Sequence, residues 1–131
     1  MATLKDLIQS DDFKKEKHVP VIEVPAHVKK GEKVKINVSV GKEIPHPNTT
    51  EHHISWIEVY FQPVNEKYPY MIGKYEFESH GASAQGPNTS TVYSDPEVTV
   101  TFRTEKSGTV IALSHCNIHG LWSNQVELKV E

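Results

Sequence analysis

The chain has 131 residues, of which 37% are hydrophobic and 24% are charged, a composition typical of one globular domain. Its formal net charge of -3 gives no reason to expect nucleic acid or an anionic membrane surface as a partner, and one cysteine excludes an internal disulfide framework. No apolar run approaches the ~20 residues that span a membrane, and the N-terminus lacks the apolar core of a signal peptide. We therefore expect a single cytoplasmic domain over residues 1–131.

The first residues predict one short helix. Thr3 can cap a helix over residues 4–9, in which Leu4, Leu7 and Ile8 recur at helical spacing. We expect this helix to pack its apolar side on the rest of the protein.

Strand patterns begin at residue 18. Residues 18–25 contain two prolines and suit a sheet edge, and residues 33–40 alternate strictly between apolar and polar side chains. Further strands are predicted at residues 53–61, 70–77, 91–93, 97–103, 109–114 and 125–130. Seven or eight short strands with only a terminal helix favour an all-β fold, an antiparallel β-sandwich of immunoglobulin-like type. A closed barrel is the alternative architecture.

Cys116, the single cysteine, lies directly after a predicted buried strand, and His119 follows it three residues later. Gly120 lets the chain turn immediately afterwards. A thiolate and an imidazole at this spacing are two metal ligands, but neither zinc nor iron is satisfied by two. The remaining ligands must come from elsewhere in the chain.

Two other segments supply histidines at loop or strand-end positions. His46 and His52 bracket a loop that contains Pro47, and His18 stands between a charged segment and the first strand. Structural zinc needs only four ligands, so five candidates exceed its requirement. Four nitrogens in a plane and one axial sulfur would leave one position open, an arrangement that suits redox chemistry on a small molecule at iron.

Three motifs together resemble superoxide reductase, specifically its one-iron class, also called neelaredoxin. They are the segments EKHVP at residues 16–20, HPNTTEH at residues 46–52 and CNIHGLW at residues 116–122. The resemblance covers nearly the whole chain. It implies an immunoglobulin-like sandwich with one mononuclear non-haem iron per chain, bound by nitrogens of His18, His46, His52 and His119 and by the sulfur of Cys116. The four-cysteine N-terminal domain of the related two-iron desulfoferrodoxins is not expected in a chain with one cysteine.

The resemblance also implies an activity, the one-electron reduction of superoxide to hydrogen peroxide without release of dioxygen. Lys17 is expected to attract the anion and to steady the developing peroxide, and Glu16 to be a sixth ligand of the ferric resting state. The backbone N–H groups of Ile118 and His119 are expected to donate hydrogen bonds to the sulfur. A separate protein such as rubredoxin would supply the electron, and one-iron members of the family are often homotetramers.

Three other readings remain open at this point. A blue-copper electron carrier would also be a β-sandwich with Cys and His on a C-terminal loop, but it needs an axial Met, and only Met1 and Met71 are present. A non-catalytic binding module and a structural zinc site are the other two. The remaining histidines fall outside the motifs and receive no role; they are His27, His53, His80 and His115.

Overall fold

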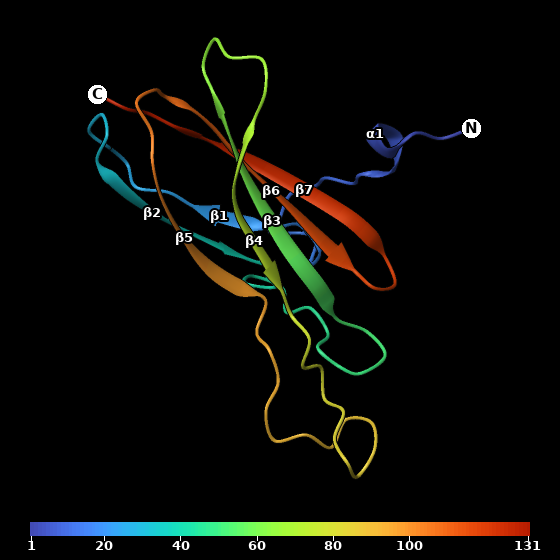
Figure 1. The fold of residues 1–131 in the computed structure, drawn as a ribbon. Coiled ribbons are helices and arrows are strands. Elements are labelled where there is room, and N and C mark those ends of the chain that lie inside the picture. Colours follow the sequence, from blue (N-terminus) through green and yellow to red (C-terminus); the bar gives the residue numbers. More distant parts are fainter.

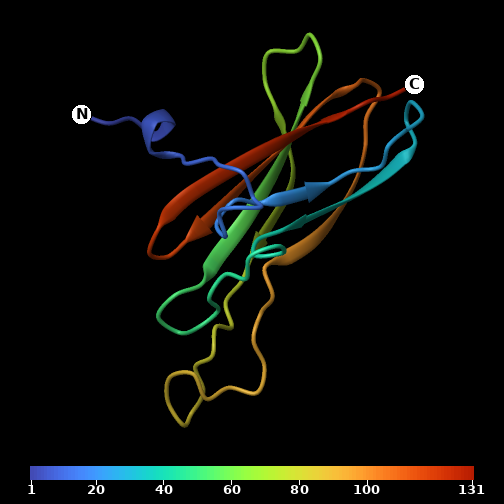
Figure 2. The same ribbon diagram turned by 180° about the vertical axis from the view of Figure 1, so that it is seen from behind.

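The computed structural model describes residues 1–131 as two antiparallel β-sheets that pack face to face (Figures 1 and 2). The smaller sheet has the order β1-β2-β5, with β1 at Val21–Glu23, β2 at Lys33–Ser39 and β5 at Glu97–Arg103. The larger sheet has the order β4-β3-β6-β7, with β3 at Ile54–Pro63, β4 at Tyr70–Glu76, β6 at Gly108–Cys116 and β7 at Gly120–Leu128. The predicted antiparallel sandwich is confirmed, and the alternative of one closed barrel is wrong.

One core of sixteen buried apolar residues joins the two sheets. On β2 the predicted alternation holds, and Val34, Ile36 and Val38 are all buried. They belong to the same core cluster as Ile57 and Val59 of β3 in the other sheet. Burial of each such side chain stabilises the fold by roughly 1.5–3 kcal/mol, so the core fixes the positions of the strand ends.

A β-bulge interrupts the first part of β3. The register against β6 shifts between Ile54 and Trp56, which leaves Ser55 as an extra residue opposite β6. Ile54 and Ile57 are therefore both buried although they are three residues apart, a spacing that would place them on opposite faces of a regular strand. The bulge changes the direction of the first part of β3, just after His52.

The N-terminal helix differs from its prediction. It covers only Leu4–Leu7 (α1), where the carboxylate of Asp6 accepts a hydrogen bond from the backbone N–H of Thr3 at 3.1 Å. Leu4 and Leu7 are 62% and 54% exposed, so the expected packing of an apolar side on the protein is wrong. The helix ends early because Gln9 then pairs with Trp122 in an extended bridge. This four-residue helix is also far too short to cross a membrane.

The strand predicted at residues 91–93 is absent. These residues lie in the long loop between β4 and β5, at the bottom of Figure 1, where Val92 and Tyr93 are 73% and 64% exposed. The apolar side chains of this segment are therefore not buried against a sheet, and the segment forms no strand. The last two strands, β6 and β7, instead extend further toward each other than predicted and meet in a tight turn.

Gly108 is the glycine with the least room for a side chain. A Cβ atom at this position would collide with the carbonyl oxygen of Gln62 and with the ring of Phe61. We expect Gly108→Ala to lower the free energy of unfolding by about 1–3 kcal/mol, as overpacking does, measured by urea denaturation. Thr101→Ala, at an exposed position of β5, is the control and should change stability little. Equal stability of both variants would contradict the prediction.

Candidate metal centre

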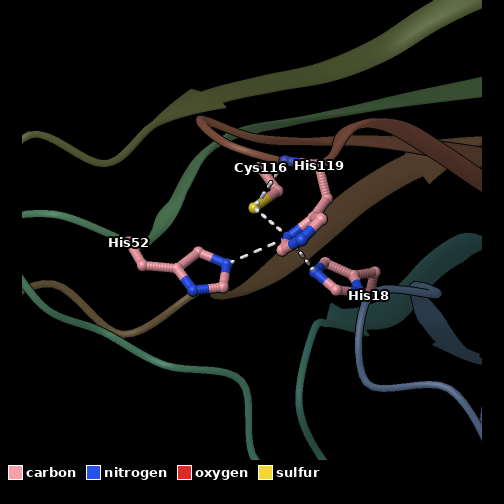
Figure 3. Close-up of side chains that lie close together, drawn as sticks. All are labelled: His18, His52, Cys116 and His119. Atoms are coloured by element: carbon pink, nitrogen blue, oxygen red, sulfur yellow. Dashed lines mark hydrogen bonds between the residues drawn. The ribbon is translucent and has the colours of Figure 1, made fainter.

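Three distant segments meet at one end of the sandwich (Figure 3). Cys116 is the last residue of β6, and His119 lies in the turn before Gly120 starts β7. Gly120 has a φ angle of 79°, a left-handed conformation that glycine adopts without strain. His52 lies two residues before β3, whose Ile54 pairs with Cys116, and His18 lies three residues before β1.

Four of the five sequence-predicted metal ligands form a compact cluster. One ligand atom from each of His18, His52, Cys116 and His119 lies within 4.8 Å of all the others. The Nδ1 atom of His119 is central: it lies 3.1 Å from Nε2 of His18, 3.3 Å from Nε2 of His52 and 3.8 Å from the sulfur of Cys116.

The spacing of these atoms also suits a shared metal ion. A neutral imidazole has one N–H donor, and its second nitrogen is only an acceptor. The tautomers of the rings and the state of the thiol decide which of these contacts are hydrogen bonds. A cation among these atoms could bind one donor atom of each of the four residues, so the donor set fits a metal ion of the kind that binds imidazole and thiolate together.

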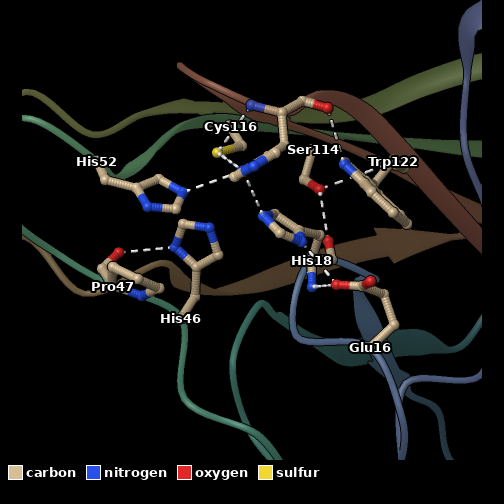
Figure 4. A network of polar contacts seen from close by, with 9 residues as sticks. Glu16, His18, His46, Pro47, His52, Ser114, Cys116 and Trp122 are labelled. Atoms are coloured by element: carbon tan, nitrogen blue, oxygen red, sulfur yellow. Dashed lines mark hydrogen bonds and ion pairs between the residues drawn. The ribbon is translucent and has the colours of Figure 1, made fainter.

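His46, the fifth predicted ligand, lies outside the four-atom cluster but beside it. Its ring centroid is 4.7 Å from those of both His18 and His52 (Figure 4). Its Nδ1 atom lies 2.6 Å from the carbonyl oxygen of Pro47, to which it donates, and its Nε2 atom is buried without a hydrogen-bond partner. An orphaned lone pair in this place is a further feature that a bound metal ion would satisfy.

The surroundings keep two of the imidazoles neutral. Burial, together with the positive charges that His18 and His52 would carry, lowers the pKa of His46 to about 4 against the opposing hydrogen bond to Pro47. Burial also lowers the pKa of His52, together with the positive charge that His119 and its neighbours would carry. Both rings therefore offer lone pairs at neutral pH, because metal ions bind the deprotonated form.

Glu16 and Trp122 hold His18 from two sides (Figure 4). The carboxylate of Glu16 lies 2.6 Å from Nδ1 of His18 and accepts a second hydrogen bond, at 2.9 Å, from the His18 backbone N–H. This contact places the ring proton on Nδ1 and leaves Nε2 directed at the cluster with its lone pair free. The indole of Trp122 stacks on the same ring, with centroids 4.9 Å apart.

A solvent-accessible cavity of about 420 Å³ adjoins the cluster. Glu16 and Lys17 line it together with His18 and His119. Burial opposes the ionisation of Glu16, but its hydrogen bonds from His18 outweigh this effect and lower the pKa of the carboxyl group. The cavity is therefore lined by charges of both signs, and a small anion that enters it comes near two lysines, Lys15 and Lys17.

The sulfur of Cys116 is fully buried and accepts a hydrogen bond from the His119 backbone N–H at 3.4 Å. The corresponding bond expected from Ile118 is not formed. A buried sulfur that accepts an N–H bond is a weaker electron donor than a free one, so this contact tunes the ligand.

The four unassigned histidines lie outside the cluster. His53 stacks on His80 with ring centroids 3.5 Å apart, and His115 stacks on Trp56 at 5.4 Å. Sequence reasoning missed the polar contacts that support the ligands, including those of Asn117 and Ser114. The first lies inside the motif CNIHGLW, and no spacing rule singles it out.

Acid should destabilise the metal-free protein through His46. Its folded pKa of about 4 lies below the ordinary 6.5, so the unfolded chain gains a proton first as the pH falls. Stability from this group is complete above pH 6.5 and is lost as the pH falls to about 4. We expect His46→Asn to flatten this part of the curve of urea midpoint against pH, whereas the exposed-site variant His27→Asn should leave the slope unchanged. A wild-type slope in His46→Asn would contradict the assignment.

The desulfoferrodoxin family model matches residues 10–125 of the chain. The superoxide reductase of Pyrococcus furiosus is 55% identical over 126 residues, which cover 96% of this chain and 99% of that protein. A solved structure of the superoxide reductase (neelaredoxin) from Archaeoglobus fulgidus in the reduced form has a TM-score of 0.88 at 59% identity, covering 94% of this chain and 98% of the other. A solved structure from Thermotoga maritima, at 60% identity, has a TM-score of 0.97 and covers 100% and 99% of the two chains. With this match in sequence and fold, the chain belongs to the desulfoferrodoxin family, among its superoxide reductases of neelaredoxin type.

Proposed function

We propose that this protein reduces superoxide at a mononuclear iron centre. The reaction consumes one superoxide anion, one electron and two protons and yields hydrogen peroxide, with no dioxygen released. The observation that carries the proposal is the convergence of His18, His52, Cys116 and His119, whose ligand atoms all lie within 4.8 Å of one another. The superoxide reductases that resemble the chain support the same reaction.

The proposed ligand set has five members, with nitrogens from His18, His46, His52 and His119 and sulfur from Cys116. When bound, iron would supply one-electron redox chemistry and a coordination position for the anion. A blue-copper site is disfavoured because Met71, the one methionine beyond the first residue, lies on β4 with 49% of its surface exposed. The orphaned Nε2 atom of His46 supports a fifth ligand, which a closed four-ligand zinc site would not use.

Lys17 and Glu16 take the roles of charged groups at the cavity. Lys17 attracts superoxide and stabilises the negative charge of the product until protons arrive from water. Glu16 orients His18 through the hydrogen bond at 2.6 Å. To become a sixth ligand of the oxidised centre, as we also propose, its carboxylate must first leave this ring.

The electron comes from a separate protein, for which we propose a rubredoxin or a similar one-electron carrier. His119 is exposed, and the neighbouring Ile118 is 57% exposed, so a partner can approach the cluster closely from this side. We further propose that residues 1–131 act as a single iron-binding unit in the cytoplasm and assemble as a homotetramer.

Cys116→Ser tests the reaction and the metal together. In the iron-loaded wild type we expect a visible sulfur-to-iron absorption band and fast oxidation of the reduced protein by superoxide in pulse radiolysis. The variant should lose the band because a hydroxyl is a poor substitute for the soft thiolate. The matched control, His27→Gln, alters an exposed histidine outside the cluster and should behave as the wild type. Copper at one ion per chain, or release of half an equivalent of dioxygen, would overturn the proposal.

Lys17→Ala tests the steering of the anion. We expect the second-order rate with superoxide to fall by roughly tenfold and its dependence on salt to weaken, because exposed charges act over ~10 Å at 0.1 M salt. Lys129→Ala is the control, because it removes the same charge at the far end of β7, the end where Leu128 pairs with Gly108. It should change neither the rate nor its dependence on salt. Identical behaviour of the two variants would exclude a local role for Lys17.

A further inference from the structure

Asn117 connects two of the segments that carry metal ligands. Its side-chain oxygen accepts a hydrogen bond from the His53 backbone N–H at 2.8 Å, and its side-chain amide donates to the carbonyl oxygen of Glu51 at 2.9 Å. Its own backbone N–H donates to the carbonyl oxygen of His53 at 3.1 Å. These three hydrogen bonds fix the backbone of Glu51 and His53, the residues on either side of His52.

The position of Asn117 in the chain makes these hydrogen bonds important for the geometry of the site. It directly follows Cys116, whose pairing with Ile54 is the last between β6 and β3. The side chain of Asn117 continues the pairing where the regular ladder stops, beyond the bulge at Ser55. The backbone of His52 is thereby fixed relative to the sulfur, although His52 itself lies in a loop.

A second asparagine supports the same loop from the other side. Asn88, in the long loop between β4 and β5, accepts a hydrogen bond from the Thr50 backbone N–H at 2.8 Å. Its amide donates to both carboxylate oxygens of Glu51, at 2.9 Å and 3.1 Å. Glu51 is therefore held through its carbonyl group by Asn117 and through its side chain by Asn88.

We propose that Asn117 is a positioning residue that sets the distance between His52 and Cys116, with Asn88 as its support. A metal site loses affinity when its ligands are free to drift by about 0.5 Å, and loss of supporting contacts typically costs 10–100-fold in affinity. The inference rests on the proposed iron site, and it assigns function to two side chains that would touch neither iron nor superoxide.

The first test compares Asn117→Ala with Gln62→Ala. Gln62 is a matched control because its side-chain amide also donates to backbone carbonyl oxygens, those of Pro63 and Glu66, at the opposite end of β3. Ferrous iron affinity is measured by competition with a chelator, the sulfur-to-iron band by visible absorption of the oxidised protein, and folding by the Tm of the metal-free protein.

We expect Asn117→Ala to bind iron 10–100-fold more weakly and to shift the band, with a loss in metal-free Tm no larger than that of Gln62→Ala. Asn117→Asp keeps the acceptor for the His53 N–H and loses the donor to Glu51, so its affinity should fall between Asn117→Ala and wild type. Wild-type affinity and band position in Asn117→Ala would overturn the proposal, as would an equal loss of affinity in Gln62→Ala. A wild-type protein that binds no iron would instead overturn the proposed function.

Asn88→Gly tests the supporting role independently. Asn88 has a φ angle of 57°, which glycine adopts without strain, so this variant removes the side chain and keeps the backbone conformation. We expect a weaker effect in the same direction, and a double variant with Asn117→Ala whose loss is not the sum of the two, because both side chains hold Glu51. Wild-type iron affinity in Asn88→Gly, or strict additivity, would exclude Asn88 from the proposal.

Discussion

The candidate site depends on one arrangement, in which imidazole nitrogens and the sulfur of a thiol lie 3.1–3.8 Å apart. The outer nitrogens of His18 and His46 are bound to Glu16 and to the Pro47 carbonyl group, so the protons of these rings point away from the cluster. Their inner nitrogens can only accept. Folding brings the ligand atoms together, so a cation that binds them only in the folded protein would stabilise the fold by linkage.

The packing of the two sheets holds the residues of the cluster in place. Sixteen buried apolar residues fix β2 and β5 against β3 and β6, and the cluster lies at the end of β6 and before the starts of β1, β3 and β7. Two of the proposed ligands, Cys116 and His119, share one turn and need little further placement. His46 and His52 come from a loop without regular structure, so their positions depend on polar contacts such as those of Asn88 and Asn117.

Sequence reasoning predicted the strands with regular alternation well and the irregular features poorly. The span Glu97–Arg103 has its predicted bounds as β5, because Val98 and Val100 alternate with exposed residues. The bulge at Ser55 left no mark in the sequence, and the apolar residues Val92 and Tyr93 resembled a strand that has no partner sheet. Four predicted ligands form the cluster, and His46 lies beside it. The motifs indicated which residues to consider, but they could not predict which ring nitrogen of each histidine faces the cluster.

The exposure of two of the rings matters for a reaction that joins an anion with an electron. His18 is buried beneath Trp122 and Glu16, next to the cavity that Lys17 lines. His119 lines the same cavity but is exposed, and its neighbour Ile118 is 57% exposed. Positive charge in the cavity attracts a small anion, whereas a protein donor has to come close to a ligand at the surface. The exposed His119 therefore offers the proposed donor a short approach to the cluster, and the cavity beside it offers the proposed substrate its way in.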